Sequence, residues 1–382
     1  MRFGEFEGEW EMKKLGDVTE KINSGKTPLG GETIYTSEGV LFIRSQNINN
    51  DRLELEHPVF IPEKINKEMK NSIVQANDIL LNITGASLGR SCVVPGDFNI
   101  GNVNQHVCII RLSKGYSSKF IQPILSSNNG QNIFKSVQTG SGREGLNFES
   151  IKSIKVYFPS LAEQKKIADF LSIIDDRIQT QNKIIQRLES LIKGLTEELF
   201  AERLRFKDDE KNEFPNWEAK MLGDVCEKKS SNISANKIED NFGSYTVYGA
   251  SGVLKSVDFY EEENDYISIV KDGAGVGRLF YCKGKSSVLG TMEIIKPKPT
   301  TNTYFLFYLL RGIDFTKYVT GSTIPHIYFK DYKIENCLIP SLSEQIKIAN
   351  SLSAIDEKIK IEKTLLHQLE NQKKYFLQNL FV

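Results

Sequence analysis

The sequence has few cysteines and histidines, and they do not group into a site. The five cysteines are widely spaced and include no C-x-x-C pair, so a disulfide framework and a zinc site are excluded. The four histidines are scattered without the spacing of metal ligands. These residues are Cys92, Cys108, Cys226, Cys282 and Cys337, and His57, His106, His326 and His367.

Long apolar runs are also absent. The longest is YFLFYLL at 304–310, whereas a membrane helix needs about 20 apolar residues. The first residues, MRFGEFEGEW, lack the basic and then apolar pattern of a signal peptide. We therefore expect a cytoplasmic protein. With 382 residues, 40% of them hydrophobic and 26% charged, the chain has the composition of a globular protein of two or three domains.

An excess of charge of one sign is missing as well. The chain has 49 basic and 49 acidic side chains; residues 1–159 carry 18 and 17 of them, and residues 217–340 carry 15 of each. Binding of nucleic acid depends strongly on basic side chains that neutralise phosphates. A nucleic-acid-binding function would therefore need a locally arranged face or a basic partner.

What the sequence does contain is an internal repeat. WEMKKLGDV at 10–18 recurs as WEAKMLGDV at 217–225, and FPSLAEQKKIADFLSIIDDRI at 158–178 recurs as IPSLSEQIKIANSLSAIDEKI at 339–359. Self-similarity of this kind indicates repeated structural units. We therefore predict two tandem copies of one plan, a variable globular segment followed by a similar tail.

Each tail predicts a long helix. SLAE at 160–163 and SLSE at 341–344 are capping boxes, in which the serine hydroxyl and the glutamate carboxylate are expected to satisfy free N–H groups. Apolar residues then recur at alternating steps of four and three, a heptad pattern that predicts packing against another helix. The obvious partner is the other tail, and the alternative is that the helices lie in the cores of two separate domains. The predicted seam contains Ile167, Leu171, Ile174, Ile178, Ile185, Leu188, Ile348, Leu352, Ile355, Ile359, Leu366 and Leu369, with Gln181 and Glu362 at one matching interior position.

The expected fold class is α+β: two mixed α/β domains separated by a long two-helix coiled coil, as a tandem repeat. Short apolar runs such as DILLNI at 78–83 and DYISIV at 265–270 predict strands, because turn residues bound them. The expected boundaries are 1–159 for the first domain, 160–200 for the first helix, 201–216 for a charged linker, 217–340 for the second domain and 341–382 for the second helix.

Three glycine-rich stretches are candidate binding loops. SGKT at 24–27 lacks the earlier glycine of a phosphate-binding loop, because position 20 is Glu. KDGAGVGR at 271–278 precedes a strand-like stretch, whereas a dinucleotide loop precedes a helix. NITGASLGR at 82–90 matches it in the first copy and also ends in arginine. Such a pair could bring backbone N–H groups and a guanidinium to a phosphate or a guanine edge, or could be only tight turns between strands.

No set of residues predicts catalysis. No asparagine or aspartate is followed by two prolines and an aromatic residue, the signature of adenine methyltransferases. A second repeated stretch, TGS at 139–141 and at 320–322, stands just before each tail. From these loops Arg143 and His326 could face DNA, or the loops could be structural hinges.

Together the motifs resemble the DNA-specificity subunits of type I restriction-modification enzymes. The resemblance rests on the tandem W-E-x-x-x-L-G-D-V segments, the TGS loops, the P-S-L-x-E-Q-x-x-I-A helix starts and FPNW at 214–217, and it covers nearly the whole chain. It implies a non-catalytic subunit whose two target-recognition domains, 1–159 and 217–340, each read half of a bipartite, asymmetric DNA sequence. It also implies that the two helices form an antiparallel coiled coil, in a pseudo-two-fold tandem repeat, and set the spacing of the half-sites.

The resemblance also implies partners. They are double-stranded DNA, two modification subunits that bind S-adenosylmethionine and methylate adenine, and two restriction subunits that use ATP and Mg; this chain would hold no cofactor or metal. Arg, Asn and Gln can make bidentate contacts to guanine and adenine edges. The expected DNA-binding residues are Lys26, Arg44, Gln46, Asn47, Arg90 and Arg143 in the first domain and Lys271, Arg278, Ser322 and His326 in the second.

Two other functions are compatible with these residues. A stand-alone sequence-specific DNA-binding regulator would bind its site tightly without any partner. A structural scaffold would bind protein through the heptad helices and would lack salt-dependent affinity for DNA.

Overall fold

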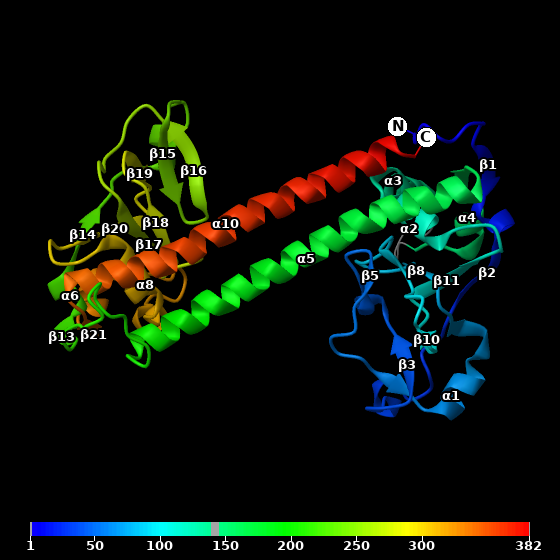
Figure 1. The fold of residues 1–382 in the computed structure, drawn as a ribbon, viewed down its shortest axis with the longest axis horizontal. Coiled ribbons are helices and arrows are strands. Elements are labelled where there is room, and N and C mark those ends of the chain that lie inside the picture. The colour runs from blue at the N-terminus through cyan, green and yellow to red at the C-terminus, as the bar shows by residue number, and fades with distance from the viewer. Residues whose placement is uncertain (1, 139–144, 382) are drawn as a thin grey trace. The chain divides into compact units, whose positions relative to one another are not determined.

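The computed structural model describes residues 2–138 and 145–381. The chain divides into two compact units, which we call the first unit (Met1–Asn182 and Leu365–Val382) and the second unit (Lys183–Thr364). Two long helices, α5 (Leu161–Phe200) and α10 (Leu342–Asn379), contribute residues to both (Figure 1). Each unit therefore combines one variable segment with a part of each long helix.

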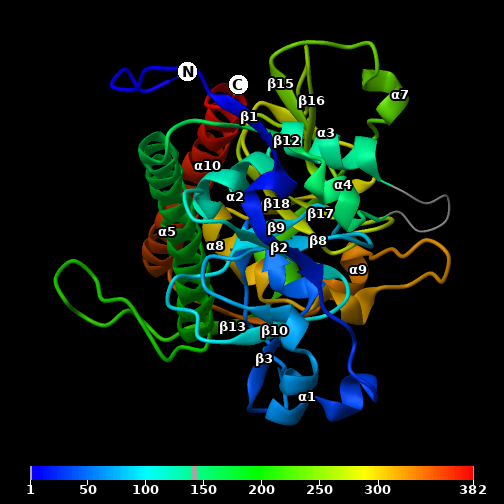
Figure 2. The same cartoon turned by 90° about the vertical axis from the view of Figure 1, so that its right-hand side faces the viewer.

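The first unit contains two four-stranded sheets, ordered β2-β11-β8-β9 and β6-β3-β10-β7, and the two-stranded pairs β1-β12 and β4-β5. Its strands are β1 (Glu11–Lys14), β2 (Thr19–Ser24), β3 (Val40–Ile43), β4 (Ile48–Asn49), β5 (Arg52–Leu53), β6 (Phe60–Ile61), β7 (Ile73–Val74), β8 (Ile79–Asn82), β9 (Ser91–Val93), β10 (Gly101–Val103), β11 (Val107–Leu112) and β12 (Lys155–Phe158). Its shorter helices are α1 (Glu63–Glu68), α2 (Ser118–Ser126), α3 (Asn128–Val137), α4 (Phe148–Lys152) and the 3-10 turns η1 (Leu15–Val18), η2 (Gly31–Ile34), η3 (Ser45–Asn47) and η4 (Lys70–Ser72). In Figures 1 and 2 α1, β3 and β10 lie at one end of this unit, and α2, α3 and α4 lie toward the other.

The second unit contains a four-stranded sheet ordered β14-β20-β17-β18, a three-stranded sheet ordered β16-β15-β19, and the pair β13-β21. Its strands are β13 (Glu218–Met221), β14 (Cys226–Ser230), β15 (Tyr245–Gly249), β16 (Gly252–Val257), β17 (Tyr266–Val270), β18 (Leu279–Cys282), β19 (Ser286–Val288), β20 (Met292–Pro297) and β21 (Asn336–Ile339). Its shorter helices are α6 (Leu222–Val225), α7 (Ala235–Ile238), α8 (Thr303–Arg311), α9 (Phe329–Tyr332) and the 3-10 turn η5 (Phe315–Tyr318).

The sequence repeat is also a repeat of fold. The four-stranded sheets β2-β11-β8-β9 and β14-β20-β17-β18 place matching strands in the same order, and all neighbours are antiparallel. In both units a second sheet holds one parallel pair, β3 with β10 and β15 with β19. Strands β8 and β17, which the apolar runs predicted, are buried along their whole length, as suits central strands. The expected α+β class is confirmed.

Helices α5 and α10 pack against each other in opposite directions. In the first unit the rings of Phe170 and Phe376 lie with their centroids 4.9 Å apart. In the second unit Lys363 pairs with Glu189 at 2.6 Å. The contact on α10 therefore lies nearer the N-terminus of its helix where the contact on α5 lies nearer its C-terminus. This is the antiparallel arrangement that the resemblance implied.

The heptad positions face the interior. Every seam residue named above is buried or half-buried, including the polar Gln181 and Glu362, which are 6% and 7% exposed. Burying one leucine or isoleucine side chain contributes roughly 1.5–3 kcal/mol. The seam is therefore a main source of the attraction between the two helices within each unit.

At the start of each long helix a buried glutamate binds an arginine from the segment that precedes the W-E-x-x-x-L-G-D-V motif of the same repeat. Arg2 donates two hydrogen bonds to Glu163, at 2.8 and 2.7 Å, and Arg205 donates two to Glu344, at 3.1 and 2.7 Å. The serine hydroxyls accept the glutamate N–H groups as the capping boxes predicted, at 3.3 and 3.4 Å, but the predicted use of the carboxylates in the cap was wrong. A buried carboxylate is satisfied best by a bidentate guanidinium. This pairing also attaches the 201–216 segment to α10.

Candidate nucleic-acid interface

The glycine loop of the first unit joins β8 to β9. Asn82 N–H donates to Arg90 O at 2.8 Å, Gly89 N–H to Asn82 O at 2.9 Å, and Leu88 N–H to Gly85 O at 3.0 Å. Gly85 and Gly89 have φ values of +76° and +86°, which L side chains rarely adopt. The glycines are therefore needed to close this compact double turn.

The glycine loop of the second unit joins β17 to β18 and repeats this arrangement bond for bond. Val270 N–H donates to Arg278 O at 2.9 Å, Gly277 N–H to Val270 O at 2.8 Å, and Val276 N–H to Gly273 O at 3.2 Å. The loop enters strand β18 and no helix, so the geometry of a dinucleotide loop is not reproduced here.

Four loops meet at one edge of the first unit. Gly25 N–H donates to Asn104 O at 3.2 Å, and Asn104 N–H donates to Ile43 O at 3.1 Å. Asn82 Nδ2 donates to the backbone oxygen of Ser45 at 2.9 Å. The loops that follow β2, β3, β8 and β10 therefore form a continuous surface, although they are far apart in the sequence.

Three of the residues predicted to bind DNA are exposed on these loops. They are Lys26, Gln46 and Arg90. Arg90 also donates from NH1 to Asn49 Oδ1 at 2.6 Å, which fixes the direction of its guanidinium. Arg143, predicted from the TGS loop, lies outside the residues that the structure describes.

The other two predicted residues of the first unit are turned inward. Asn47 is 6% exposed; its Oδ1 accepts Arg44 N–H at 3.0 Å and its Nδ2 donates to Glu54 O at 3.0 Å, so both polar atoms are used inside the loop. Arg44 is half-buried, with its guanidinium 5.7 Å from the centre of the Tyr35 ring. Its Nε is buried and has no hydrogen-bond partner among the described residues.

The predicted residues of the second unit gather where the glycine loop meets the TGS loop. Gly273 N–H donates to Pro325 O at 2.8 Å, and Ile327 N–H donates to Lys271 O at 3.0 Å. His326 is half-buried beside this contact, while Ser322 is exposed. Arg278 is exposed, and its NH1 donates to Ala250 O at 2.9 Å. The predicted residues at this contact are Lys271, Arg278, Ser322 and His326.

A polar group beside the first glycine loop was missed in the sequence. Thr84 Oγ1 lies 2.6 Å from His106 Nδ1, and Gln105 Nε2 lies 3.1 Å from His106 Nε2. Thr27 donates its hydroxyl to Gln105, which is exposed. The signal was the stretch NVNQH at 102–106, a polar interruption between two strands.

A groove between the long helices forms a second surface of the first unit. It has a volume of about 840 Å³ and is lined by residues of both α5 and α10. Ile173 on α5 and Leu365 on α10 are 61% and 41% exposed there. Contiguous exposed apolar surface can mark a site that binds another protein, which makes this groove a candidate for such a site.

The family model described as "Type I restriction modification DNA specificity domain" matches residues 7–190 and 215–371. The chain belongs to this family. The DNA specificity subunit resembles the type I restriction enzyme MjaVIII specificity subunit of Methanocaldococcus jannaschii, with 28% identity over 97% of this chain and 92% of that protein. The MjaIX specificity subunit of the same organism is 25% identical over 93% and 89%. The crystal structure of a type I S subunit from M. genitalium has the same fold, with a TM-score of 0.69 and 17% identity over 98% of this chain and 96% of that one.

As a specificity subunit, the protein leaves catalysis to partner subunits. Its five cysteines are free and buried, and burial raises the pKa of Cys92 and Cys108 to about 12, so these thiols stay protonated. No group of three metal-ligating side chains occurs among residues 2–138 and 145–381. In the same described residues, no helix combines the length and apolarity that crossing a membrane requires.

One stretch of the specificity subunit matches a catalytic pattern by letter only. GASLG at 85–89 has the G-x-S-x-G spacing of a nucleophile elbow. That elbow joins a strand to a helix, whereas this loop joins β8 to β9. Ser87 Oγ accepts a hydrogen bond from Asn82 Nδ2 at 3.1 Å, so its role here is to shape the loop.

Proposed function

We propose that the protein reads a bipartite, asymmetric DNA target, one half-site with each unit, and thereby directs adenine methylation or restriction by its partners. The observation that carries this proposal is the pair of glycine loops, which share their backbone hydrogen bonds but present different side chains. Thr84 of the first loop corresponds to Asp272 of the second, and His106 beside it corresponds to Thr291. Two loops with the same backbone hydrogen bonds and different side chains are consistent with the reading of two different half-sites.

Within each unit the proposed readers are those predicted DNA-binding side chains whose polar atoms are not all used inside their own loop. Lys26, Gln46 and Arg90 are exposed on the first surface, and the buried Nε of Arg44 has no hydrogen-bond partner within residues 2–138 and 145–381. Arginine and glutamine can make bidentate contacts to guanine and adenine edges, and lysine can contact a phosphate. In the second unit the proposed readers are Lys271, Arg278, Ser322 and His326. We assign Asn47 a supporting role, since the loop uses both of its polar atoms.

The paired helices are proposed to set the spacing between half-sites. Helix α5 has 40 residues, which at 1.5 Å per residue is about 60 Å. Two half-sites that face one side of DNA lie about 34 Å apart, or a multiple of it. One heptad added to each helix at matching seam positions keeps the seam and adds about 10 Å, or about three base pairs. An unchanged spacing in such a variant would contradict this role.

The groove on the helices is the proposed contact for partner subunits. Ile173 and Leu365 are exposed apolar side chains that line this groove. The proposed partners are two modification subunits that bind S-adenosylmethionine and two restriction subunits that use ATP and Mg. The equal numbers of basic and acidic side chains in this chain, 49 of each, are consistent with partners that share the neutralisation of DNA phosphates.

The test is to co-express the chain with the modification subunit of its own host and to map methylated adenines across the genome. We expect one bipartite motif, which disappears when the chain is omitted. Exchange of residues 217–340 for those of another specificity subunit should change one half of the motif and leave the other intact. No new methylation, from a modification subunit shown to be folded and to bind S-adenosylmethionine, would favour a stand-alone regulator or a scaffold.

A further inference from the structure

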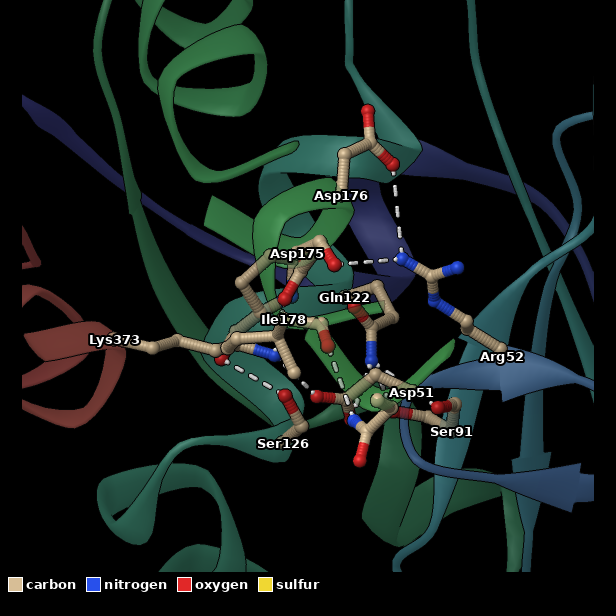
Figure 3. A network of polar contacts seen from close by, with 11 residues as sticks. Asp51, Arg52, Ser91, Gln122, Ser126, Asp175, Asp176, Ile178 and Lys373 are labelled. Atoms are coloured by element: carbon tan, nitrogen blue, oxygen red, sulfur yellow. Dashed lines mark hydrogen bonds and ion pairs between the residues drawn. The ribbon is translucent and has the colours of Figure 1, made fainter. Parts of the chain in front are cut away.

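Lys373 is a charged residue in the apolar seam of α10. Its side chain is 17% exposed, and its Nζ lies 2.8 Å from Asp51 Oδ2 and 2.8 Å from Asp175 Oδ1. Burial by itself lowers the pKa of Lys373, but the charges of Asp51 and Asp175 raise it above the ordinary value. The ammonium therefore stays charged between two carboxylates from distant parts of the chain, as Figure 3 shows.

Asp51 lies at the tip of a short hairpin formed by β4 and β5. Asn50 and Asp51 have φ values of 48° and 60°, the left-handed pair of a two-residue hairpin turn. Gln122 of α2 donates to Asp51 Oδ1 at 3.1 Å, and Arg52 NH2 donates to the backbone oxygen of Asp175 at 3.0 Å. Figure 3 shows these side chains converging from the hairpin, α2, α5 and α10. The tip is therefore held from three helices at once.

The same hairpin contacts two of the proposed readers through Asn49, the residue just before the turn. Asn49 Oδ1 accepts Arg90 NH1 at 2.6 Å, and Asn49 Nδ2 donates to Gln46 O at 2.8 Å. A movement of the tip therefore changes the position of the side chain that orients Arg90. The contact of Lys373 with Asp51 and the contact of Asn49 with Arg90 are thus joined through the backbone of the two-residue turn.

The second unit has an apolar residue at the seam position that matches Lys373. The position that matches Lys373 in the heptad of α5 is Ile192, which is 5% exposed in the apolar core. Asp356, which matches Asp175, accepts Tyr308 Oη at 2.5 Å and pairs with Arg311 at 3.4 Å. The charged contact at this seam position is thus a feature of the first unit.

We propose that Lys373 is a positioning residue for the first half-site: it holds the 48–53 hairpin against the helices and so sets where Arg90 and Gln46 meet the DNA. The role rests on the proposed function of the chain as a reader of two half-sites. Lys373 itself contacts no DNA. Without its ammonium, Asp51 and Asp175 would face each other with like charges, which drives the hairpin tip away from α5.

The test compares Lys373→Met, which keeps an unbranched side chain one atom shorter and removes its charge, with Lys373→Arg, which keeps the charge. Lys363→Met is the matched control, because Lys363 lies on the same helix in an exposed pair with Glu189 in the second unit. Each variant is assembled with the modification subunit, and methylation is measured on duplexes with single-base changes in either half-site. We expect Lys373→Met to lower discrimination against wrong bases in the first half-site about tenfold. Discrimination in the second half-site should stay unchanged, and Lys363→Met should change neither half-site. Lys373→Arg should recover most of the loss.

Equal losses in both half-sites, or an unchanged first half-site, would overturn the proposal. If Lys373→Met fails to fold, Asp51→Asn removes the same ion pair while its amide oxygen can still accept from Gln122. Hydrogen exchange of the 48–53 amides tests, without DNA, whether Lys373 holds the hairpin, a contact we call the clamp. Lys373→Met and Asp51→Asn should both exchange faster there, and an unchanged rate would contradict the clamp. A wild-type complex that methylates no bipartite motif would instead refute the proposed function, and hydrogen exchange would still decide whether the clamp exists.

Discussion

Each of the two units contains a four-stranded sheet, and matching strands have the same order in both sheets, but the units differ in what surrounds the sheet. Their glycine loops have matching backbone hydrogen bonds, while Ser87 of the first loop corresponds to Gly275 of the second. Gly275 has a φ of +96°, and Ser87 does not share this conformation. The comparison indicates that the backbone frame places the loops and that the side chains on them are free to vary with the target.

The units differ more sharply where they contact the helices. The first uses the charged group of Lys373, Asp51 and Asp175, and the second uses Ile192 in an apolar core. A buried ion pair demands a specific geometry from all its partners, whereas apolar side chains tolerate small shifts. We therefore expect the position of the hairpin in the first unit to depend on a few residues, and that of the matching region in the second to depend on packing as a whole.

The largest effect is expected when the charge of the first unit is placed in the second. Ile192→Lys would bury an ammonium in a core where the matching carboxylate, Asp356, already binds Tyr308 and Arg311. An unpaired buried charge costs about 4 kcal/mol of unfolding free energy. Urea denaturation should show this loss, and the control Ile192→Met should lose about 1 kcal/mol. Equal stability of the two variants would mean that the seam of the second unit admits a charge.

The next effect concerns the arginine–glutamate pairs at the helix starts. Arg205→Met would leave Glu344, which is fully buried, with Trp217 as its remaining side-chain donor, and should cost about 3 kcal/mol. Arg2→Met should cost less, because the Arg2 side chain is 34% exposed and that of Arg205 is 19% exposed. Thermal denaturation of both variants checks the order, and a greater loss for Arg2→Met would reverse the comparison.

A smaller effect is expected on recognition. Arg90→Ala and Arg278→Ala should each weaken discrimination by about 2 kcal/mol at one position of the target. The two changes should affect opposite half-sites, because each arginine belongs to its own unit. Methylation of single-base variants of the target measures this, with Arg203→Ala as the control for loss of an exposed arginine. Changes in the same half-site from both variants would refute the assignment of one half-site to each unit.

The smallest effect is expected at the matching positions Ser87 and Gly275, of which only Gly275 has a positive φ. Gly275→Ser should cost about 1 kcal/mol because of its positive φ, although a Cβ there would meet its nearest neighbour only at 3.4 Å. Ser87→Gly should cost about 0.5 kcal/mol through greater freedom of the unfolded chain. Thermal melting compares the two, and a neutral Gly275→Ser would show that this loop can relax.

Much of the frame was predictable because its signals are local. Strands such as β8 and β17 follow from continuous apolar runs, and the long helices follow from a heptad pattern with a serine before each first turn. The pairing of the two helices followed from the repeat of that pattern, and their antiparallel direction was implied by the family resemblance. Neither prediction required knowledge of which distant residues meet.

The polar contacts were predicted less well. Glu163 is a reasonable cap by its spacing, yet it binds Arg2, which lies 161 residues away. Asn47 has the side chain of a base reader, yet it is turned into its own loop. The cluster of Thr84, Gln105 and His106 forms only when the ends of β8 and β10 meet.

The sequence alone therefore determined the repeat, the α+β frame, the helix pair and the family, because periodicity and motif spacing are properties of neighbouring residues. Only the tertiary structure decided which polar side chains are free to bind and which are used inside the protein. Lys373 and Asp51 are 322 residues apart, and nothing in either neighbourhood marks them as partners. An ion pair depends on where the folded chain brings two charges together, and its energy changes over a few ångströms that no local pattern encodes.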